Sequence, residues 1–322
     1  MKFFVTGGAG FIGSRVCRQL VDAGHEVISY DAFIRYLPPT FPGSRDYFDI
    51  RFDGIADKVV FIRGDTAHKS DLMRAIQAHR PDACIHLAAL PLADLAFDHT
   101  DEAIESVLVG AVNVLEAIRE TDSVKRFVYA SSSMVYGDFQ HLPCDEDHAK
   151  NPKEIYGSLK LAGETITKAF GVRYGIEWCI IRPSAVYGPT DQNRRVSEIF
   201  LSNAIRGEKL VLHGGGENTL DFTYIDDIAS GFVLAATHEK AANEVFNITR
   251  GEGRSLKDLV DILRAEGFDF PVEIVNQEMY RPMRGALSIQ KARDLLGYDP
   301  RYSLEDGMRK YIDFYKEHVI FE

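Results

Sequence analysis

The chain has 322 residues, of which 45% are hydrophobic and 26% are charged, and its formal net charge is −11. This length allows one large domain with a smaller partner lobe, and the acidic balance argues against a nucleic-acid partner. No stretch reaches the roughly 20 apolar residues of a membrane-spanning helix, so we expect no membrane partner. The four scattered cysteines form no Cys-x-x-Cys pair, and we expect a cytoplasmic protein.

The N-terminus begins with a short apolar run, residues 2–6, which is typical of a buried strand. A glycine turn with the spacing Gly7-x-x-Gly10-x-x-Gly13 follows, and apolar residues at helical spacing come next. Strand, glycine turn and helix together predict a dinucleotide site, because small residues let the backbone approach a pyrophosphate at the positive end of the helix. Gly13 also allows close packing of the helix on the strand.

A second predicted strand, residues 26–30, ends in Asp31, eighteen positions after Gly13. A carboxylate there can accept hydrogen bonds from the adenosine ribose and would repel a 2′-phosphate. The sequence therefore favours NAD over NADP. The next stretch, 32–54, is rich in aromatic residues, proline and arginine, and we expect a long loop beside the adenosine end of the cofactor.

Short runs with strand composition alternate with helical patterns through the first half of the chain. The runs are residues 59–62, 83–87, 126–130 and 178–181. Between them, one apolar helix face extends from residue 104 to residue 118. This alternation predicts an α/β fold with a Rossmann-type, doubly wound parallel sheet and right-handed crossovers.

Tyr156 and Lys160 lie four positions apart, so a helix would place the phenol and the ammonium on one face. Lowering the tyrosine pKa from about 10 by about three units requires about 4 kcal/mol. One positive charge about 4 Å away supplies an energy of that order, but desolvation opposes the shift, so a second cation would help. By itself this short pattern favours an exposed helix with a solvated lysine.

After residue 183 the pattern becomes less regular. We expect helices at 194–206, 226–238, 255–265 and 303–317, and strands near 210–212, 244–248 and 272–275. Residues 1–182 are predicted to form the NAD-binding domain, which also recruits about 213–240. Residues 183–322 are predicted to form mainly a smaller C-terminal α/β lobe that binds substrate over the carboxyl edge of the sheet.

Eight sequence blocks occur in the order found in the extended short-chain dehydrogenase/reductase family. The chain resembles in particular the nucleotide-sugar epimerases and dehydratases of that family, over nearly its whole length. The blocks are Thr6–Gly13, Gly64–Asp65, His86–Ala89, Ser131–Gly137, Tyr156–Lys160, Arg182–Pro189, Asp221–Asp227 and Lys291–Gly297.

The resemblance implies roles for the matching residues. Tyr156 would be the catalytic base, Lys160 would bind the nicotinamide ribose and lower the pKa of the phenol, and Ser132 would hydrogen-bond the reacting hydroxyl. The oxidised nicotinamide ring would be the second cation. The implied NAD-binding residues are Gly7, Gly10, Phe11, Ile12, Gly13, Asp31, Asp65, Thr66, Leu87, Ala88, Ala89, Tyr156 and Lys160.

The implied reaction begins when Tyr156 removes a proton from a sugar hydroxyl while hydride moves from the same carbon to NAD. The 4,6-dehydratases of the family carry an Asp-Glu pair after the active-site Thr, where this chain has Ser133 and Met134. We therefore expect an epimerase that acts at C4 through a transient 4-keto sugar. A dehydratase that uses other groups, such as Cys144, Asp145 or Glu146, and a net 4-dehydrogenase remain alternatives.

Three positions depart from the family pattern, namely Val107 and Ala185, where the family has asparagines, and Leu220, where it has an arginine that grips the diphosphate. Diphosphate binding would then fall to Arg281 or Arg284, or to the neighbouring pair Arg194 and Arg195. The expected substrate-binding residues are Ser133, Ser184, Arg194, Arg281 and Arg284. The substrate would be a UDP-, GDP- or dTDP-linked sugar.

The helices around 101–121 and 154–173 form the four-helix bundle of a dimer in many relatives, so we expect a homodimer. His86, on a predicted buried strand, is expected to be a hydrogen-bonded core residue, whereas His141 and His148 are expected to be solvated. No His, Asp or Glu cluster has metal-ligand spacing, so no metal is expected.

Overall fold

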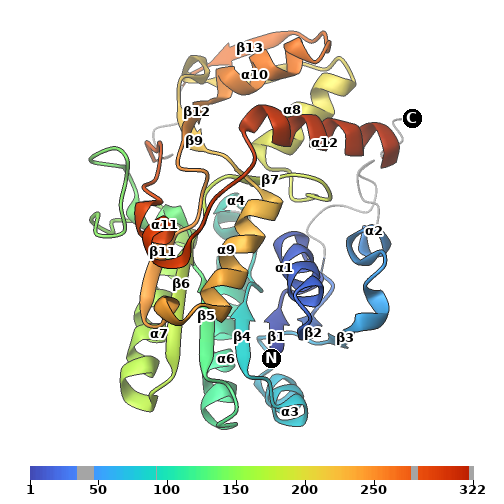
Figure 1. Ribbon diagram of the computed structural model, residues 1–322. Helices are drawn as coiled ribbons and strands as arrows, with labels where there is room; N and C mark the ends of the chain where they lie inside the picture. The colour runs from blue at the N-terminus through green and yellow to red at the C-terminus, as the bar shows by residue number, and fades with distance from the viewer. Residues whose placement is uncertain (35–46, 92, 277–281, 319–322) are drawn as a thin grey trace.

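The computed structural model describes residues 1–34, 47–91, 93–276 and 282–318. Its central element is a seven-stranded sheet in the order β11-β6-β5-β4-β1-β2-β3 (Figure 1). Every pairing in this sheet is parallel. Its strands are β1 (Lys2–Thr6), β2 (Glu26–Asp31), β3 (Val59–Arg63), β4 (Ala83–His86), β5 (Arg126–Ala130), β6 (Glu177–Arg182) and β11 (Glu244–Asn247). The predicted fold class is confirmed.

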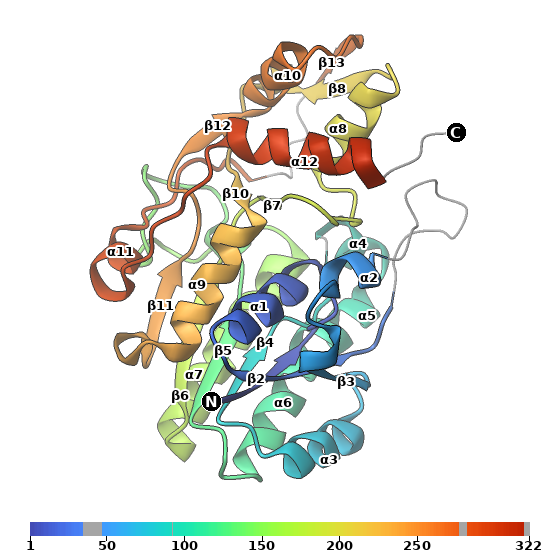
Figure 2. The same ribbon diagram turned by 45° about the vertical axis from the view of Figure 1, so that its right-hand side comes forward.

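Helices cover both faces of the sheet (Figures 1 and 2). On one face α1 (Phe11–Asp22) packs against α9 (Ile225–Thr237). The other face carries α3 (Lys69–His79), α6 (Gly110–Arg119) and α7 (Ile155–Tyr174). Successive side chains of a strand point to opposite faces. Phe3 and Val5 of β1 accordingly belong to one buried cluster and Phe4 to the other, which explains why the strands are apolar throughout.

The second lobe lies beyond the carboxyl ends of the strands (Figure 2). Its helices are α8 (Val196–Ile205), α10 (Leu256–Ala265) and α12 (Leu304–His318), close to the predicted ranges. Short strand pairs complete it, namely β8 (Leu210–His213) with β13 (Val272–Val275), β9 (Thr219–Asp221) with β12 (Gly253–Ser255), and β7 (Val186–Tyr187) with β10 (Thr223–Tyr224).

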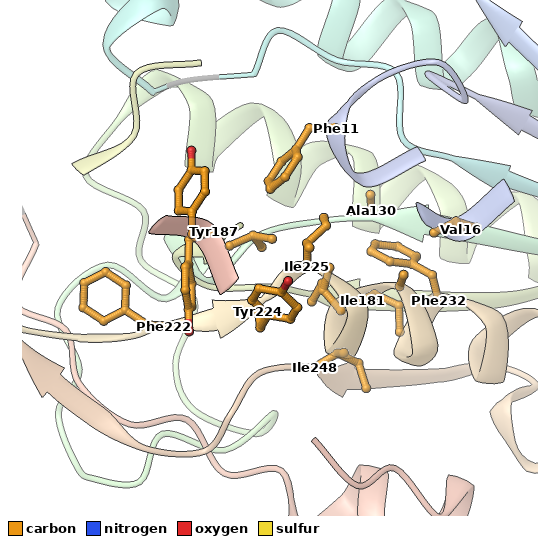
Figure 3. Packing of buried hydrophobic residues seen from close by; sticks show 14 of the residues in the cluster. Phe11, Val16, Ala130, Ile181, Tyr187, Phe222, Tyr224, Ile225, Phe232 and Ile248 are labelled. Carbon is orange, nitrogen blue, oxygen red and sulfur yellow. The ribbon is translucent and has the colours of Figure 1, made fainter. Parts of the chain in front are cut away.

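One apolar cluster runs from the sheet into the second lobe, so the two lobes share a core. It includes Phe3 of β1, Phe232 of α9 and Tyr315 of α12. Figure 3 shows part of this cluster, including Tyr187 and Tyr224 of the second lobe and Phe232 of α9. None of the helices among the described residues is long and apolar enough to cross a membrane.

Two features differ from what the sequence pattern indicated. The predicted strand near 244–248 is the edge strand β11, so the chain beyond residue 182 returns to the main sheet. The proposed domain boundary at residue 182 stays a prediction. The expected loop 32–54 contains the short helix α2 (Phe48–Phe52), because its aromatic rings pack on Phe61 of β3 at 4.7–5.0 Å.

The two lobes are also joined by Asp227 of α9, whose carboxylate accepts the backbone N–H groups of Arg301 and Tyr302 at 2.9 and 3.1 Å. Asp227→Asn should lower the free energy of unfolding by about 1–3 kcal/mol, because an amide can accept only one of these bonds and its NH₂ faces the other N–H. Urea denaturation would measure the loss.

Asp226→Asn is the matched control. Asp226 forms a 3.4 Å ion pair with Arg15 and a third of its side chain is exposed, so its loss should cost less than about 1 kcal/mol. Equal losses for the two variants would contradict the proposed role of Asp227 between the lobes.

Candidate active site

The glycine turn after β1 allows a close approach that larger residues would prevent. Gly7 has φ +68°, and a Cβ on it would lie 2.7 Å from the backbone nitrogen of Ala88, beyond the end of β4. A Cβ on Gly13 would lie 2.0 Å from the carbonyl oxygen of Gly7. Gly10, the N-cap of α1, has no side chain to cap the helix. The turn thus leaves the positive end of α1 facing the crevice between β1 and β4, where this sheet order binds dinucleotides.

The crevice contains a cavity that brings together every residue expected to bind NAD. The glycine turn, the end of β2, the segment after β4 and the start of α7 all contribute. The predicted residues that line it are Gly7, Gly10, Phe11, Ile12, Gly13, Asp31, Asp65, Thr66, Leu87, Ala88, Ala89, Tyr156 and Lys160. The individual contacts with NAD stay predictions, but the chemistry of these residues fits a dinucleotide.

Asp31 is fixed at the end of β2 by two backbone groups. Its Oδ2 accepts the N–H of Ala9 in the glycine turn at 3.0 Å, and its Oδ1 accepts the N–H of Phe33 at 2.8 Å. Burial raises the pKa of this carboxyl, and these hydrogen bonds partly offset the shift. The carboxylate therefore lies at the cavity in the position that the ribose interaction requires.

Tyr156 and Lys160 lie at the start of α7, and the Lys160 Nζ is 5.6 Å from the centre of the Tyr156 ring. The same Nζ donates to the carbonyl oxygen of Ala130, the last residue of β5, at 2.7 Å. Burial lowers the pKa of Lys160 to about 7. Lys160 is thus buried and Tyr156 partly buried in the cavity wall, and the alternative of an exposed helix with a solvated lysine is wrong.

The protein groups alone do not lower the pKa of the phenol. Burial raises the pKa of Tyr156 to about 12, and the positive charge of Arg195 acts in the opposite direction without cancelling it. Desolvation of the phenol therefore dominates, and the expected lowering of its pKa by Lys160 stays a prediction.

Three serines follow β5. Ser131 lines the cavity and donates to Glu164 of α7. Ser132 is the N-cap of the short helical turn η3 (Ser133–Tyr136), and its Oγ accepts the N–H of Met134 at 3.2 Å. Ser133 is buried, and its N–H donates to the carbonyl oxygen of Pro183 at 2.9 Å. All three serines are buried, and of the three only Ser131 lines the cavity, so the role of Ser132 at the reacting hydroxyl stays a prediction.

The other residues expected to bind substrate are spread around the site. Ser184 is buried, and neither it nor Arg194 lines the cavity, whereas Arg195 does. Arg284 lies against Met134, with 3.4 Å between its Nη1 and the thioether sulfur. Arg281 is outside the described residues. Their roles in substrate binding stay predictions.

A buried ion pair that the sequence analysis did not single out lies behind the catalytic residues. Arg182, at the end of β6, pairs with Glu164 of α7 through two bonds of 2.7 and 2.8 Å, and both side chains are almost fully buried. Arg182 also donates to the hydroxyl of Tyr136 at 2.9 Å, which donates to Asn247 of β11 at 2.7 Å. The sequence did carry one signal for this pair. Glu164 lies four residues after Lys160, so a helix places both side chains on the same face.

The first departure from the family pattern lies in an unusual helix. Residues 104–118 were expected to form one helix face, but Ile104–Val109 form the π-helical turn η2 between α5 (Thr100–Ala103) and α6. Val107 is buried there in an apolar cluster that includes Tyr156 and Leu159. Val107 therefore makes an apolar contact at the position where the family pattern has an asparagine. Glu105 and Ser106 of the same turn line the cavity.

The histidine predictions met different outcomes. His86 is buried and its Nδ1 is 2.7 Å from the hydroxyl of Thr6, so the core assignment is confirmed. His148 is not solvated as expected but buried, because its Nε2 accepts the N–H of Gln140 at 2.8 Å in a loop that folds back on itself. Within the described residues, no group of three or more His, Cys, Asp or Glu could hold a metal ion.

The acid–base groups considered for a dehydratase lie elsewhere. Cys144 is fully buried, and the carboxylate of Glu146 accepts the N–H of Asn247 at 2.8 Å. Neither of them nor Asp145 lines the cavity. The loop that carries them supports the sheet edge at β11 and is not part of the cavity wall.

These features define a nicotinamide-dependent enzyme of the short-chain dehydrogenase type. They are the parallel Rossmann-type sheet, the glycine turn, the carboxylate expected at the ribose, and the helix that carries Tyr156 and Lys160. The chain belongs to the NAD dependent epimerase/dehydratase family, whose family model matches residues 3–249.

Relatives named for different activities match almost the whole chain. It is 30% identical over 346 residues to dTDP-glucose 4,6-dehydratase 1 of Escherichia coli, covering 98% of this chain and 92% of the relative. It is 28% identical over 321 residues to UDP-glucose 4-epimerase of Mycolicibacterium smegmatis, covering 98% and 99%. The structure of UDP-glucuronic acid 4-epimerase from Bacillus cereus with UDP-glucuronic acid and NAD aligns with a TM-score of 0.89, at 29% identity and 98% and 99% coverage.

Burial of Lys160 leads to a prediction about stability. A lysine whose pKa falls from 10.5 to about 7 on folding costs stability at every pH below 10.5, and the full cost applies below about 7. In protein freed of nucleotide, Lys160→Met should raise the free energy of unfolding at pH 7 by about 1–3 kcal/mol, after allowing for the lost hydrogen bond to Ala130. The gain should shrink toward pH 10, as urea denaturation at pH 7, 8.5 and 10 would measure.

Lys168→Met on the same helix is the control, because the Lys168 ammonium lies over the Trp178 ring near the surface. Its effect should not change with pH. A Lys160→Met protein that is destabilised equally at all three pH values would contradict the argument.

Proposed function

We propose that this protein is an NAD-dependent nucleotide-sugar epimerase that acts at C4 through a transient 4-keto sugar and retains its cofactor. The observation that carries the proposal is the single cavity in which the glycine turn and Asp31 meet Tyr156, Lys160 and Ser131. The epimerases among the relatives support the same reaction class.

NAD, when bound in this cavity, supplies the acceptor and donor of hydride for the sugar carbon. The glycine turn would hold its pyrophosphate, Asp31 its adenosine ribose and Lys160 its nicotinamide ribose. Tyr156 takes the proton from the 4-hydroxyl and later returns it, and Ser132 hydrogen-bonds the reacting oxygen. For a net epimerisation the keto sugar must present its other face before hydride returns to C4 and the proton returns to the oxygen.

Tyr156 requires nearby positive charge to act as a base at neutral pH, because burial holds its pKa near 12 in the protein alone. Two basic side chains line the same cavity, Lys160 and Arg195. The nicotinamide ring of bound NAD would supply a further positive charge. Each of these charges would act more strongly on the phenolate in its partly desolvated position than in bulk water.

The residues after Ser132 favour epimerisation over dehydration. A dehydratase must move a proton and release water, which needs an acid and a base beside the sugar. Ser133 is buried, and Met134 presents a thioether that contacts Arg284. Neither side chain can transfer a proton in place of the Asp-Glu pair of the 4,6-dehydratases, so we rank the dehydratase and the net 4-dehydrogenase as alternatives.

We further propose a UDP-sugar as substrate, because UDP-sugars are the ligands named for the epimerase relatives. GDP- and dTDP-sugars are the alternatives. We also propose a cytoplasmic homodimer. Apolar side chains on the helices expected to form the dimer interface are exposed, namely Ile104, Val109 and Val172, and a dimer would cover them.

The reaction can be tested with a panel of UDP-, GDP- and dTDP-sugars followed by NMR at C4, absorbance at 340 nm and mass spectrometry. An epimerase gives the C4 epimer with no net absorbance change. Accumulation of NADH would identify a dehydrogenase, and a product lighter by one water would identify a dehydratase.

Tyr156→Phe should reduce kcat by about 100- to 10,000-fold, because it removes the proton-transfer group while keeping the ring. Tyr174→Phe, at the exposed end of the same helix, is the control and should keep wild-type kcat. Unchanged turnover in Tyr156→Phe would sink the mechanism.

A further inference from the structure

The charge of the cavity does not match the ligands of the proposed reaction. NAD and a nucleotide sugar each carry a diphosphate, whereas the chain has a net charge of −11. The acidic residues that line the cavity are Asp31, Asp65, Glu102 and Glu105. Among the described lining residues only Lys160 and Arg195 are basic. The Lys160 ammonium is engaged by the carbonyl of Ala130 and its pKa is lowered to about 7, so Arg195 is the permanently charged one.

Arg195 lies between the cofactor turn and the catalytic helix. Its guanidinium carbon is 5.5 Å from the centre of the Phe11 ring, at the first turn of α1. It is also close enough to Tyr156 for its charge to oppose the raised pKa of that phenol. A group bound by Arg195 would therefore lie near the reacting hydroxyl and near the cofactor.

Asp191 holds Arg195 in this position. The Arg195 Nη1 is 2.6 Å from Asp191 Oδ1, and the aspartate side chain is fully buried. The same oxygen accepts the N–H of Asn193 at 3.2 Å. Asp191 occupies one terminal nitrogen of a guanidinium that has donors on three nitrogens. Arg195 can therefore be held by Asp191 and bind a ligand at the same time.

The loop that carries this pair is fastened on two sides. Arg51 of α2 donates to the carbonyl oxygen of Thr190 at 2.7 Å and to its hydroxyl at 3.3 Å. On the other side the hydroxyl of Tyr311 of α12 donates to the carbonyl oxygen of Asp191 at 3.5 Å. Because both anchors come from separate elements, Arg195 is supported by the fold and not only by its own loop.

The arginine opposite Leu220 does not supply a positive charge to the cavity. The partner of Leu220 across the β9–β12 ladder is Arg254. The Arg254 guanidinium is 2.7 Å from Glu305 and 3.3 Å from Asp258, and it does not line the cavity.

We propose that Arg195, anchored by Asp191, binds the diphosphate of the nucleotide sugar beside Tyr156. This rests on the proposed function, because it assigns a binding residue within that same site. A guanidinium is suited to the task, since its planar donors match two phosphate oxygens at once. The diphosphate is attached at C1 of the sugar, so holding it would fix one end of the ring and orient the C4 hydroxyl at the other end toward Tyr156.

The test uses Arg195→Gln and Arg195→Lys in the full-length protein with its NAD. Calorimetry would give the affinities for UDP, UMP and uridine, and steady-state assays the KM and kcat for the sugar that wild type converts. Arg195→Gln should weaken UDP binding and raise KM about 10- to 100-fold, the range for a lost charge-assisted hydrogen bond. UMP should weaken less, uridine not at all, and NAD content should be unchanged. Arg195→Lys should recover part of the loss.

Arg309→Gln is the control, because Arg309 is an exposed residue of α12 paired with Glu266. It should behave as wild type. Loss of bound NAD with unchanged UDP affinity in Arg195→Gln would assign the residue to the cofactor and overturn the proposal. Equal weakening of UDP, UMP and uridine would also overturn it, by showing a general disturbance of the site.

Failure of the proposed function gives a separate result. If wild type binds UDP but converts no nucleotide sugar, the epimerase assignment fails. The role of Arg195 is still tested, because the loss of affinity in Arg195→Gln can be compared between UDP and uridine. If wild type binds none of UDP, GDP and dTDP, both proposals fail.

Discussion

The buried ion pair between Glu164 and Arg182 is the constraint on which the site depends. Removing both charges from water costs several kcal/mol each, and only good geometry with further hydrogen bonds offsets that cost. The two bonds of the pair and the contacts with Ser131 and Tyr136 provide this geometry. Glu164 shares a helix face with Tyr156 and Lys160. The ion pair between Glu164 and Arg182 therefore fixes how α7 is rotated about its axis and how far it extends along the sheet.

The same network connects the catalytic helix to the returning part of the chain. Tyr136 donates to Asn247 at the end of β11, and the Asn247 amide donates to the carbonyls of Cys144 and Ser288 at 3.1 and 3.2 Å. These segments are far apart in sequence and meet at one edge of the sheet. Directional bonds accept one arrangement of their partners, whereas apolar contacts tolerate several. The polar network therefore sets the position of the second lobe relative to the cavity.

The elements and the cofactor cavity could be predicted from the sequence because their signals are local. Strand and helix periodicity gave the parallel sheet, and the glycine spacing together with Asp31 led to a cavity that the structure contains. Interactions between distant segments were not predictable. Adjacent arginines 194 and 195 look alike in sequence, and only the loop held by Asp191 determines which one faces the cavity. The place of β11 likewise depends on partners remote in the chain.

Desolvation links the stability of the site to its chemistry. Excluding water from Tyr156 and Lys160 shifts both pKa values toward the neutral forms, which alone would weaken a base. The same low dielectric multiplies the effect of every charge placed in the cavity. A positive charge next to the phenol therefore lowers its pKa far more here than on a solvated helix. The cavity favours a base that becomes effective when positive charge is brought to it, and the anchored guanidinium of Arg195 is a permanent part of that charge.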